Sequence, residues 1–203
     1  MKLYYKPGAC PLATHIILKE IGKDFEIESV DTDKQVTGSG ADFTKINPKG
    51  YVPVLQLDNG EYLTEGAAIL QFLADQNPAS ELAPKNGTLQ RARLQEHLNY
   101  ISGELHKAFG PFFSSTSSDE EKQKAKINVE NKLNYFESIL SGEQKYLLGD
   151  KFSIADASFF VISSWALPTG IGLSKWPKIA AFSKRVANRA SVQSAMRVEG
   201  LID

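Results

Sequence analysis

The chain has 203 residues, of which 42% are hydrophobic and 23% are charged. These proportions are typical of globular proteins, and the length suffices for one large domain or two small ones. The formal net charge of −1 gives no positive excess for binding nucleic acid or an anionic membrane, and both are excluded as main partners. A single cysteine allows no internal disulfide and predicts a reducing, cytoplasmic environment for a protein stabilised by packing.

The first 80 residues alternate between strand and helix signals. Residues 2–5 predict a strand, and Leu12, Ile16 and Ile17 recur at helical spacing before Gly22 ends the helix. Phe25 then begins an alternating segment that predicts a second strand. A strand that follows a strand and a helix usually pairs in parallel with the first, so we expect a β-α-β unit.

A β-hairpin is expected next, after a flexible loop at 37–40 and a short helical turn at 42–46. Residues 54–57 and 62–63 flank Asp58, Asn59 and Gly60, which tolerate the positive φ of a hairpin turn. A helix over 66–76 follows the hairpin. Residues 1–80 therefore predict a small α/β domain with a mixed sheet.

Strand signals end beyond the turn-forming residues at 77–87, so we place a domain boundary there and predict an all-helical domain over 87–203. Ser118 and Ser153 each begin a capping box at a helix start. The helix predicted over 154–167 is apolar nearly all round, so it belongs at the domain centre. Two stripes predict long amphipathic helices, Leu94, Leu98, Ile101 and Leu105 in one and Val129, Leu133, Phe136 and Leu140 in the other.

Cys10 is the first candidate for chemistry, because it lies between the first strand and Pro11, a good first residue of a helix. A thiol at a helix N-terminus is expected to favour the thiolate. The alternative is that Cys10 is a small buried hydrophobe. A dithiol motif would need a second cysteine at the position of Ala13, so only mixed disulfides with a small thiol are open to Cys10.

A second candidate site is the segment that holds Val52, Pro53, Glu65 and Gly66. Pro53 interrupts a strand pattern and lacks an N–H, which indicates an edge or a ligand-facing turn. Gly66 leaves bare amides at a helix start that attract a carboxylate, while Glu65 can bind an ammonium group. The pattern predicts a site for an amino-acid-like ligand end.

On the helix around Leu98, the residues Asn99, Gly103 and His106 are spaced to share one polar face. Gly103 is costly within a helix and suggests close approach by another group. His106 could donate a hydrogen bond to a sulfur or act as a base, and the alternative is a solvated helix face. Among the other histidines, His15 is expected to pack inside the first helix and His97 to lie on the surface.

Three weaker candidates lie in the first domain. Tyr5 could hydrogen-bond a sulfur, although packing is the favoured interpretation. Gln35 and Lys34 lie in a loop from which either could reach a carboxylate, although a solvated loop is favoured there too. The sequence contains no phosphate-binding glycine motif, no Ser/His/Asp elbow and no zinc motif. Nucleotide-binding and hydrolase functions therefore lack support, and no metal site is predicted.

Four motifs occur in order along the chain: Tyr4-Tyr5-Lys6-Pro7-Gly8-Ala9-Cys10, Asn47-Pro48-Lys49-Gly50-Tyr51-Val52-Pro53, Thr64-Glu65-Gly66 and Phe152-Ser153-Ile154-Ala155-Asp156. Together they resemble the motifs of the bacterial beta-class glutathione S-transferases, and the match spans essentially the whole chain. The resemblance implies a thioredoxin-like N-terminal domain, an all-helical C-terminal domain and a homodimer that binds glutathione in each subunit. Glutathione would be a co-substrate, with no cofactor.

By that resemblance Pro53 would be cis, and the Val52 backbone would pair with the cysteinyl part of glutathione. Three positions depart from the class: Gln35 replaces a frequent lysine, Gly103 a hydroxyl residue, and Pro11 a small polar residue. The resemblance implicates Cys10 and His106 as catalytic residues, and Tyr5, Gln35, Val52, Pro53, Glu65, Gly66, Asn99 and Gly103 as glutathione contacts.

The leading hypothesis is detoxification by conjugation, in which the bound glutathione thiolate attacks an apolar electrophile. A second hypothesis is a glutathione-dependent thiol transferase or peroxidase, in which Cys10 forms the mixed disulfide. A third is a non-enzymatic protein that uses the same fold to carry apolar ligands. The electrophile would contact helical-domain side chains such as Phe109, Phe112, Phe113 and Trp165.

Overall fold

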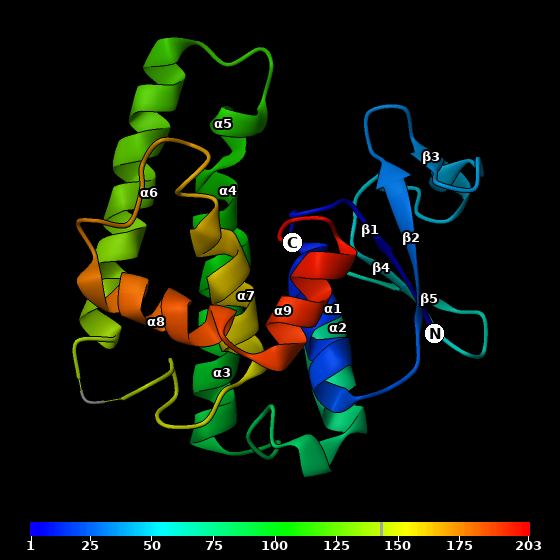
Figure 1. Ribbon diagram of the computed structural model, residues 1–203, viewed down its shortest axis with the longest axis horizontal. Coiled ribbons are helices and arrows are strands. Elements are labelled where there is room, and N and C mark those ends of the chain that lie inside the picture. Colours follow the sequence, from blue (N-terminus) through cyan, green and yellow to red (C-terminus); the bar gives the residue numbers. More distant parts are fainter. Residues whose placement is uncertain (143) are drawn as a thin grey trace. The chain divides into compact units, whose positions relative to one another are not determined.

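The computed structural model describes residues 1–142 and 144–203 and divides them into two compact units (Figure 1). The first unit contains Met1–Glu81 and Asn188–Asp203, and the second contains Leu82–Ala187. The predicted helical domain over 87–203 therefore extended too far, because the C-terminal segment joins the first unit. Its helix α9 (Ala190–Val198) packs against α1 (Pro11–Ile21), where the Glu20 carboxylate binds Arg189 and Ser191.

The first unit is built on a five-stranded mixed sheet with the strand order β3-β2-β1-β4-β5. Strands β1 and β2 pair in parallel, which confirms the predicted β-α-β unit, and the remaining neighbours are antiparallel. The short strand β3 lies where the sequence predicted only a flexible loop, because Thr37 pairs with Val30. The strands are β1 (Lys2–Tyr5), β2 (Glu26–Asp31), β3 (Val36–Thr37), β4 (Val54–Gln56) and β5 (Tyr62–Thr64).

The helices of this unit begin and end close to where the sequence predicts. Helix α1 ends at Gly22, whose φ of 75° lets its N–H reach the carbonyls of the last turn. Its buried face, which includes Ile16 and Ile17, packs near the fully buried Leu3 of β1, and α1 also contacts α2 and α9 (Figure 1). The other helical segments are η1 (Phe43–Lys45), α2 (Gly66–Gln76) and η2 (Pro78–Ser80).

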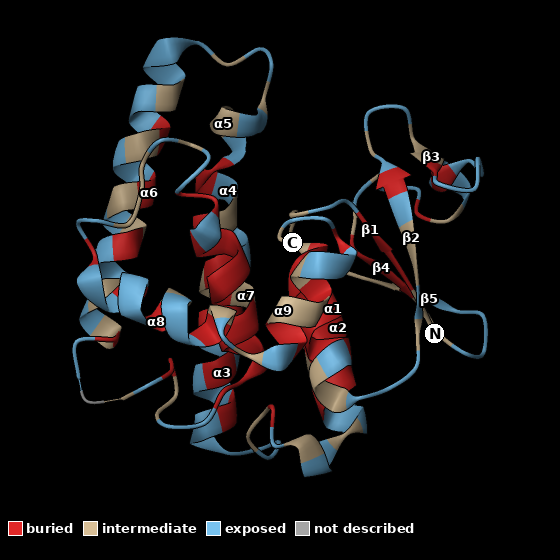
Figure 2. Cartoon of the chain, viewed as in Figure 1, coloured by how far each residue is buried: buried red, intermediate tan, exposed pale blue. Residues whose placement is uncertain are grey.

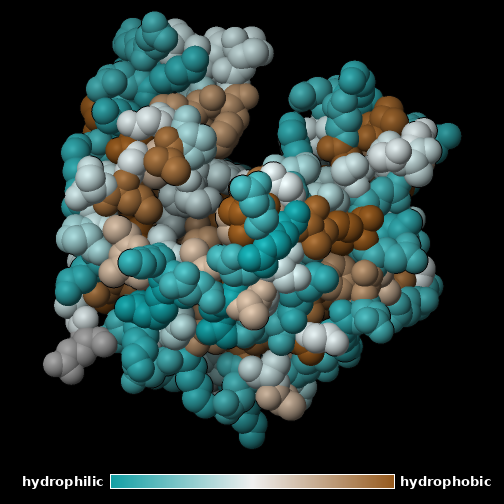
Figure 3. Space-filling model, in the orientation of Figure 1, coloured by the Kyte–Doolittle hydropathy of each residue, from teal (hydrophilic) through white to brown (hydrophobic). Residues whose placement is uncertain are grey.

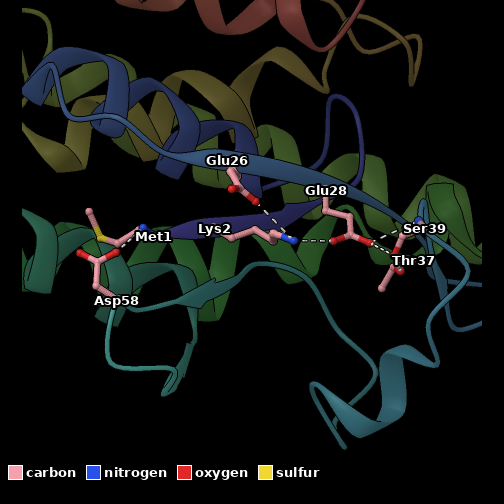
Figure 4. Close-up of polar contacts among 7 residues, drawn as sticks. All are labelled: Met1, Lys2, Glu26, Glu28, Thr37, Ser39 and Asp58. Carbon is pink, nitrogen blue, oxygen red and sulfur yellow. Dashed lines mark hydrogen bonds and ion pairs between the residues drawn. The ribbon is translucent and has the colours of Figure 1, made fainter.

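A polar cluster joins the central strand β1 to its neighbour β2 and to the β3 segment (Figure 4). Lys2 Nζ lies 3.1 Å from Glu28 Oε2, and Ser39 Oγ donates to Glu28 Oε1 at 2.6 Å. Burial by itself raises the pKa of Glu28, but hydrogen bonds from Ser39, Thr37 and Lys2 outweigh it and lower the pKa to about 2. The cluster therefore stabilises the fold above the ordinary pKa of 4.5 and loses that effect as pH falls towards about 2.

The named elements described in the second unit are all helices, as predicted. Ser118 and Ser153 each form a complete capping box, and the buried Asp156 accepts the N–H groups of Leu147 and Ser153. Figure 2 shows α7 as the most buried helix of this unit, with α8 against it. The helices are α3 (Leu89–Tyr100), α4 (His106–Ala108), α5 (Gly110–Phe113), α6 (Asp119–Ile139), α7 (Ile154–Ser164) and α8 (Pro177–Ala187).

Three local predictions in this unit were wrong. Helix α7 ends at Ser164 instead of 167, because the following N–H groups make tighter turn bonds, such as Trp165 N to Ile162 O. His97 is buried, 7% exposed, and its ring lies 6.4 Å from that of Phe136. The helix expected through Leu105 changes at Ile101–Leu105 into a π-helical segment, η3.

No helix in the described residues is long and apolar enough to span a membrane.

Candidate functional site

Cys10 lies where the sequence predicts, immediately before helix α1, with Pro11 as the first helical residue. Its thiol points to the segment before β4, because Cys10 Sγ donates to the Val52 carbonyl at 3.6 Å. The chain therefore brings the cysteine and the Val52-Pro53 segment together within the first unit.

The predicted thiolate, however, is wrong for the unliganded protein. Burial of the sulfur raises the pKa of Cys10 to about 12, and the negative charge of Glu65 adds to this effect. The helix-start backbone hydrogen bond lowers the pKa but does not outweigh the burial. Cys10 is therefore a neutral S–H donor at physiological pH.

The Val52–Pro53 peptide bond is cis, as the resemblance implied. Pro53 has no N–H to donate, and the Val52 N–H makes no hydrogen bond to any described residue. Helix α2 begins beside this bend, since a Cβ added at Gly66 would lie 3.7 Å from Pro53 Cγ. Main-chain groups of Val52 and the first amides of α2 thus lie on neighbouring segments, as a site for a peptide ligand requires.

Glu65 immediately precedes α2 and has a φ of 68°, which is unusual for a residue with a side chain. Its carboxylate lies 2.8 Å from Lys49 Nζ, which also donates to Thr64 Oγ1 at 3.0 Å. The Glu65 side chain is 69% exposed, so the carboxylate is accessible to an ammonium group that replaces Lys49. Sequence reasoning missed Lys49, although its place in the Asn-Pro-Lys-Gly motif was visible.

Two of the three weaker candidates of this unit, Gln35 and Tyr5, have internal roles. Gln35 Nε2 donates to the carbonyls of Thr32 and Gly50, at 2.6 and 3.1 Å, so both of its donors join two loops of the chain. A contact from this amide to a ligand carboxylate would have to replace one of these bonds. Tyr5 is buried and packs edge-on against His15, in agreement with the packing interpretation.

The second unit holds Asn99, Gly103 and His106, which differ in exposure. Asn99 and Gly103 are exposed, whereas His106 is half-buried. The π-helical segment Ile101–Leu105 contains Gly103 and takes an extra residue per turn, so the regular helical spacing used to group the three residues does not hold there. The close approach expected at Gly103 is absent among the described side chains, since a Cβ there would have no neighbour within 4 Å.

His106 instead belongs to an aromatic cluster with Phe109, Phe113 and Trp165. Its ring is edge-on to that of Trp165, with ring centroids 5.0 Å apart. The Trp165 ring is also edge-on to those of Phe109 and Phe113, at centroid distances of 5.8 and 5.2 Å. Burial and then the charge of Lys107 lower the pKa of His106, which favours the neutral imidazole. Phe113 is 59% exposed, so the cluster reaches the surface. The face of the molecule in Figure 3 carries hydrophobic areas among hydrophilic ones.

No three His, Cys, Asp or Glu side chains gather as metal ligands in the part of the chain that the structure describes. The candidate groups are therefore a thiol donor, main-chain amides, a carboxylate and an aromatic cluster.

Comparison with known proteins identifies the family. Residues 9–76 match the model of the glutathione S-transferase N-terminal domain, and residues 100–190 match that of the C-terminal domain. A glutathione S-transferase, GstA, from Escherichia coli O157:H7 is 45% identical over 99% of this chain and 100% of its own length. The chain belongs to the glutathione S-transferase family.

Solved glutathione S-transferases share the fold over nearly their whole length. A ternary complex of BphK, a bacterial member, is 50% identical with a TM-score of 0.96, covering 99% of this chain and 100% of that chain. The beta-class enzyme of Sphingomonas chungbukensis is 44% identical with a TM-score of 0.96, and both chains are fully covered. A sphingomonad glutathione S-transferase complexed with glutathione is 44% identical with a TM-score of 0.95, also with full coverage. The predicted beta-class resemblance is confirmed.

Proposed function

We propose that this glutathione S-transferase binds glutathione in its first unit and joins the tripeptide, through its sulfur, to an apolar electrophile. The main support is the hydrogen bond that the Cys10 thiol donates to the Val52 carbonyl, beside the cis Val52–Pro53 peptide bond. A peptide that pairs with the Val52 backbone would bring its own sulfur close to this donor. In relatives the same fold is found with glutathione bound.

The neutral state of Cys10 supports conjugation over exchange. A thiol with a pKa of about 12 is a poor nucleophile at neutral pH, but it is a donor that can stabilise a neighbouring thiolate. Lowering the pKa of bound glutathione by two units corresponds to about 2.7 kcal/mol of preferential thiolate stabilisation. The S–H donor and the N-terminus of α1 are groups that can supply it.

The γ-glutamyl end of glutathione carries an ammonium and a carboxylate. We assign the ammonium to Glu65, where it replaces the Lys49 ammonium of the unliganded chain, and the carboxylate to the amides of Gly66 and the next residue. Roles for Asn99 and the neutral imidazole of His106 beside the ligand are part of the same proposal and follow from the family resemblance.

In the reaction, the glutathione sulfur forms a bond to the electrophilic carbon, and the leaving group departs with its electron pair. The thiol proton is released to solvent before the attack. We assign recognition of the electrophile to the aromatic cluster of Phe109, Phe113 and Trp165 in the second unit. The reaction requires glutathione as co-substrate and no bound cofactor, and we place the enzyme in the cytoplasm as a homodimer.

The test is calorimetry with glutathione, followed by a spectroscopic assay with a chlorodinitrobenzene electrophile. We expect saturable glutathione binding and conjugate formation that depends on enzyme. Binding without turnover of any electrophile would favour the ligand-carrier hypothesis instead. No binding at millimolar glutathione would refute the proposal. Light scattering during gel filtration tests the dimer.

A further inference from the structure

A buried polar network connects the C-terminal helix with the loop that carries Cys10. Glu199, at the end of α9, is 6% exposed, and its two carboxylate oxygens have different partners. Oε2 accepts the N–H of Gly8 at 3.0 Å, and Oε1 lies 2.9 Å from His15 Nδ1 on α1. One side chain from the end of the chain thus binds both the loop and the helix that flank the cysteine.

The loop is shaped so that this contact controls its path. Gly8 has a φ of 70°, a conformation that favours glycine, and a Cβ there would lie 3.3 Å from Leu201 Cδ2. The Ala9 N–H returns to the Lys6 carbonyl at 3.1 Å, which closes a turn directly before Cys10. A shift of Gly8 would therefore move the turn and, with it, the sulfur that lies against Val52.

The Glu199–His15 contact also helps to hold α9 on α1. The packing of these two helices has a second anchor at the other end of α9, where the Glu20 carboxylate binds Arg189 and Ser191. The Glu199 carboxylate is also costly to bury, because a charged group in the interior loses its hydration. His15 is fully buried as well, and its Nε2 atom has no hydrogen-bond partner among the described atoms. The buried Glu199 carboxylate, whose desolvation costs free energy, contacts the Cys10 loop through the Gly8 N–H.

We propose that Glu199 is a positioning residue that keeps the Cys10 loop closed, with the half-buried thiol held against the Val52 carbonyl. The carboxylate acts through the Gly8 N–H and does not itself touch the sulfur. The consequence for conjugation rests on the proposed function, in which Cys10 is a donor to bound glutathione. The effect on Cys10 itself does not, because it concerns the unliganded protein.

The test measures alkylation of Cys10 by iodoacetamide in the full chain, where the single cysteine makes the labelling site unambiguous. Glu199→Ala should raise the labelling rate at pH 8 by about tenfold or more, because exposing the sulfur also lowers its pKa. Glu199→Gln should stay within about twofold of wild type, since the amide oxygen can accept from Gly8 while its NH₂ donates to the other tautomer of His15.

Glu20→Ala is the matched control, because it removes the other anchor of α9 without touching the loop. It should lower the melting temperature but leave labelling within about twofold of wild type when both are measured well below their midpoints. Equal acceleration by Glu20→Ala and Glu199→Ala would overturn the proposal, as would an unchanged rate in a folded Glu199→Ala. Neither result would depend on glutathione binding, so the two proposals fail separately.

If Glu199→Ala does not fold, hydrogen exchange of the Gly8 amide in the wild-type chain tests the proposal instead. The Gly8 amide should exchange about a hundredfold or more slowly than in an unstructured peptide, because a buried carboxylate accepts its hydrogen. Rapid exchange of this amide would overturn the proposal.

Discussion

Helices α1 and α2 both begin beside the candidate site, but their first residues are in opposite environments. The α1 start carries Cys10, whose sulfur is desolvated and whose pKa rises to about 12. The α2 start carries Glu65, whose side chain is 69% exposed and is paired with Lys49. The same N-terminal dipole is present at both.

The contrast between Cys10 and Glu65 shows that a helix N-terminus does not by itself set the ionisation state of the group at its start. Dipole stabilisation is worth about 0.3–1 kcal/mol at an exposed terminus, whereas burial can shift a pKa by several units. Desolvation therefore decides the state of Cys10. The first helix start supplies a neutral donor, and the second supplies charge and free amides.

The largest expected effect comes from removing the sulfur at the α1 start. Cys10→Ala should abolish any disulfide exchange with oxidised glutathione, because no other cysteine exists in the chain. Conjugation should fall by about tenfold or less, since the reacting sulfur is that of glutathione and one donor is worth about 1 kcal/mol. Parallel assays of both activities check this, and equal loss of both would contradict the division of roles.

The pH dependence of Cys10 follows from its raised pKa. Labelling of the unliganded protein should rise about tenfold per pH unit from about pH 7 to about pH 10, because the thiolate fraction rises in that proportion. An unfolded thiol ionises near 9.0 and the folded one near about 12, so alkaline pH favours unfolding. Wild type should therefore lose stability relative to Cys10→Ser above about pH 9. A labelling plateau near neutral pH would contradict the buried thiol.

At the α2 start, Glu65→Gln should weaken glutathione binding by roughly 10- to 100-fold, the value of a charge-assisted hydrogen bond to an ammonium group. Calorimetry measures the change, and a glutathione analogue without the amino group should bind both proteins alike. Glu61→Gln is the matched control, since Glu61 is an exposed acid four residues before Glu65 whose carboxylate accepts a hydrogen bond from the Asn59 side chain. Equal losses in both variants would point to general electrostatics.

The smallest effect is expected at Gly66. Gly66→Ala should leave glutathione affinity within about threefold and stability within about 1 kcal/mol, because the added Cβ meets Pro53 Cγ at an ordinary 3.7 Å. Gly22→Ala is the contrasting variant, since its φ of 75° is strained for alanine and should cost about 1 kcal/mol. Denaturant unfolding of both proteins measures the contrast. A large loss of affinity in Gly66→Ala would show that the ligand approaches this backbone more closely than proposed.

Local sequence signals predicted most of the regular elements. The capping boxes at Ser118 and Ser153, the hairpin at Gly60 and the end of α1 at Gly22 all occur as expected, because each is set by neighbouring residues. Strand β3 and helix α9 were not predicted. Strand β3 has only two residues, too few for an alternating pattern. Helix α9 packs on α1, far away in the chain, and has few local signals that assign it to a domain.

The candidate site divides in the same way. Sequence placed Cys10, Val52 and Pro53 together through the family resemblance, and the structure joins them by a hydrogen bond. It did not foresee that His106 turns towards Trp165, because helical periodicity assumes an unbroken α-helix. The binding roles of Asn99 and Gly103 stay predictions.

Motifs and periodicity are local properties of the chain, and they were enough to predict the family, the two kinds of secondary structure and the residue types that the site offers. The neutral Cys10 thiol and the contact from Glu199 back to Gly8 became apparent only in the folded protein. Desolvation and long-range hydrogen bonds depend on what surrounds a group in space, and no local pattern records those neighbours.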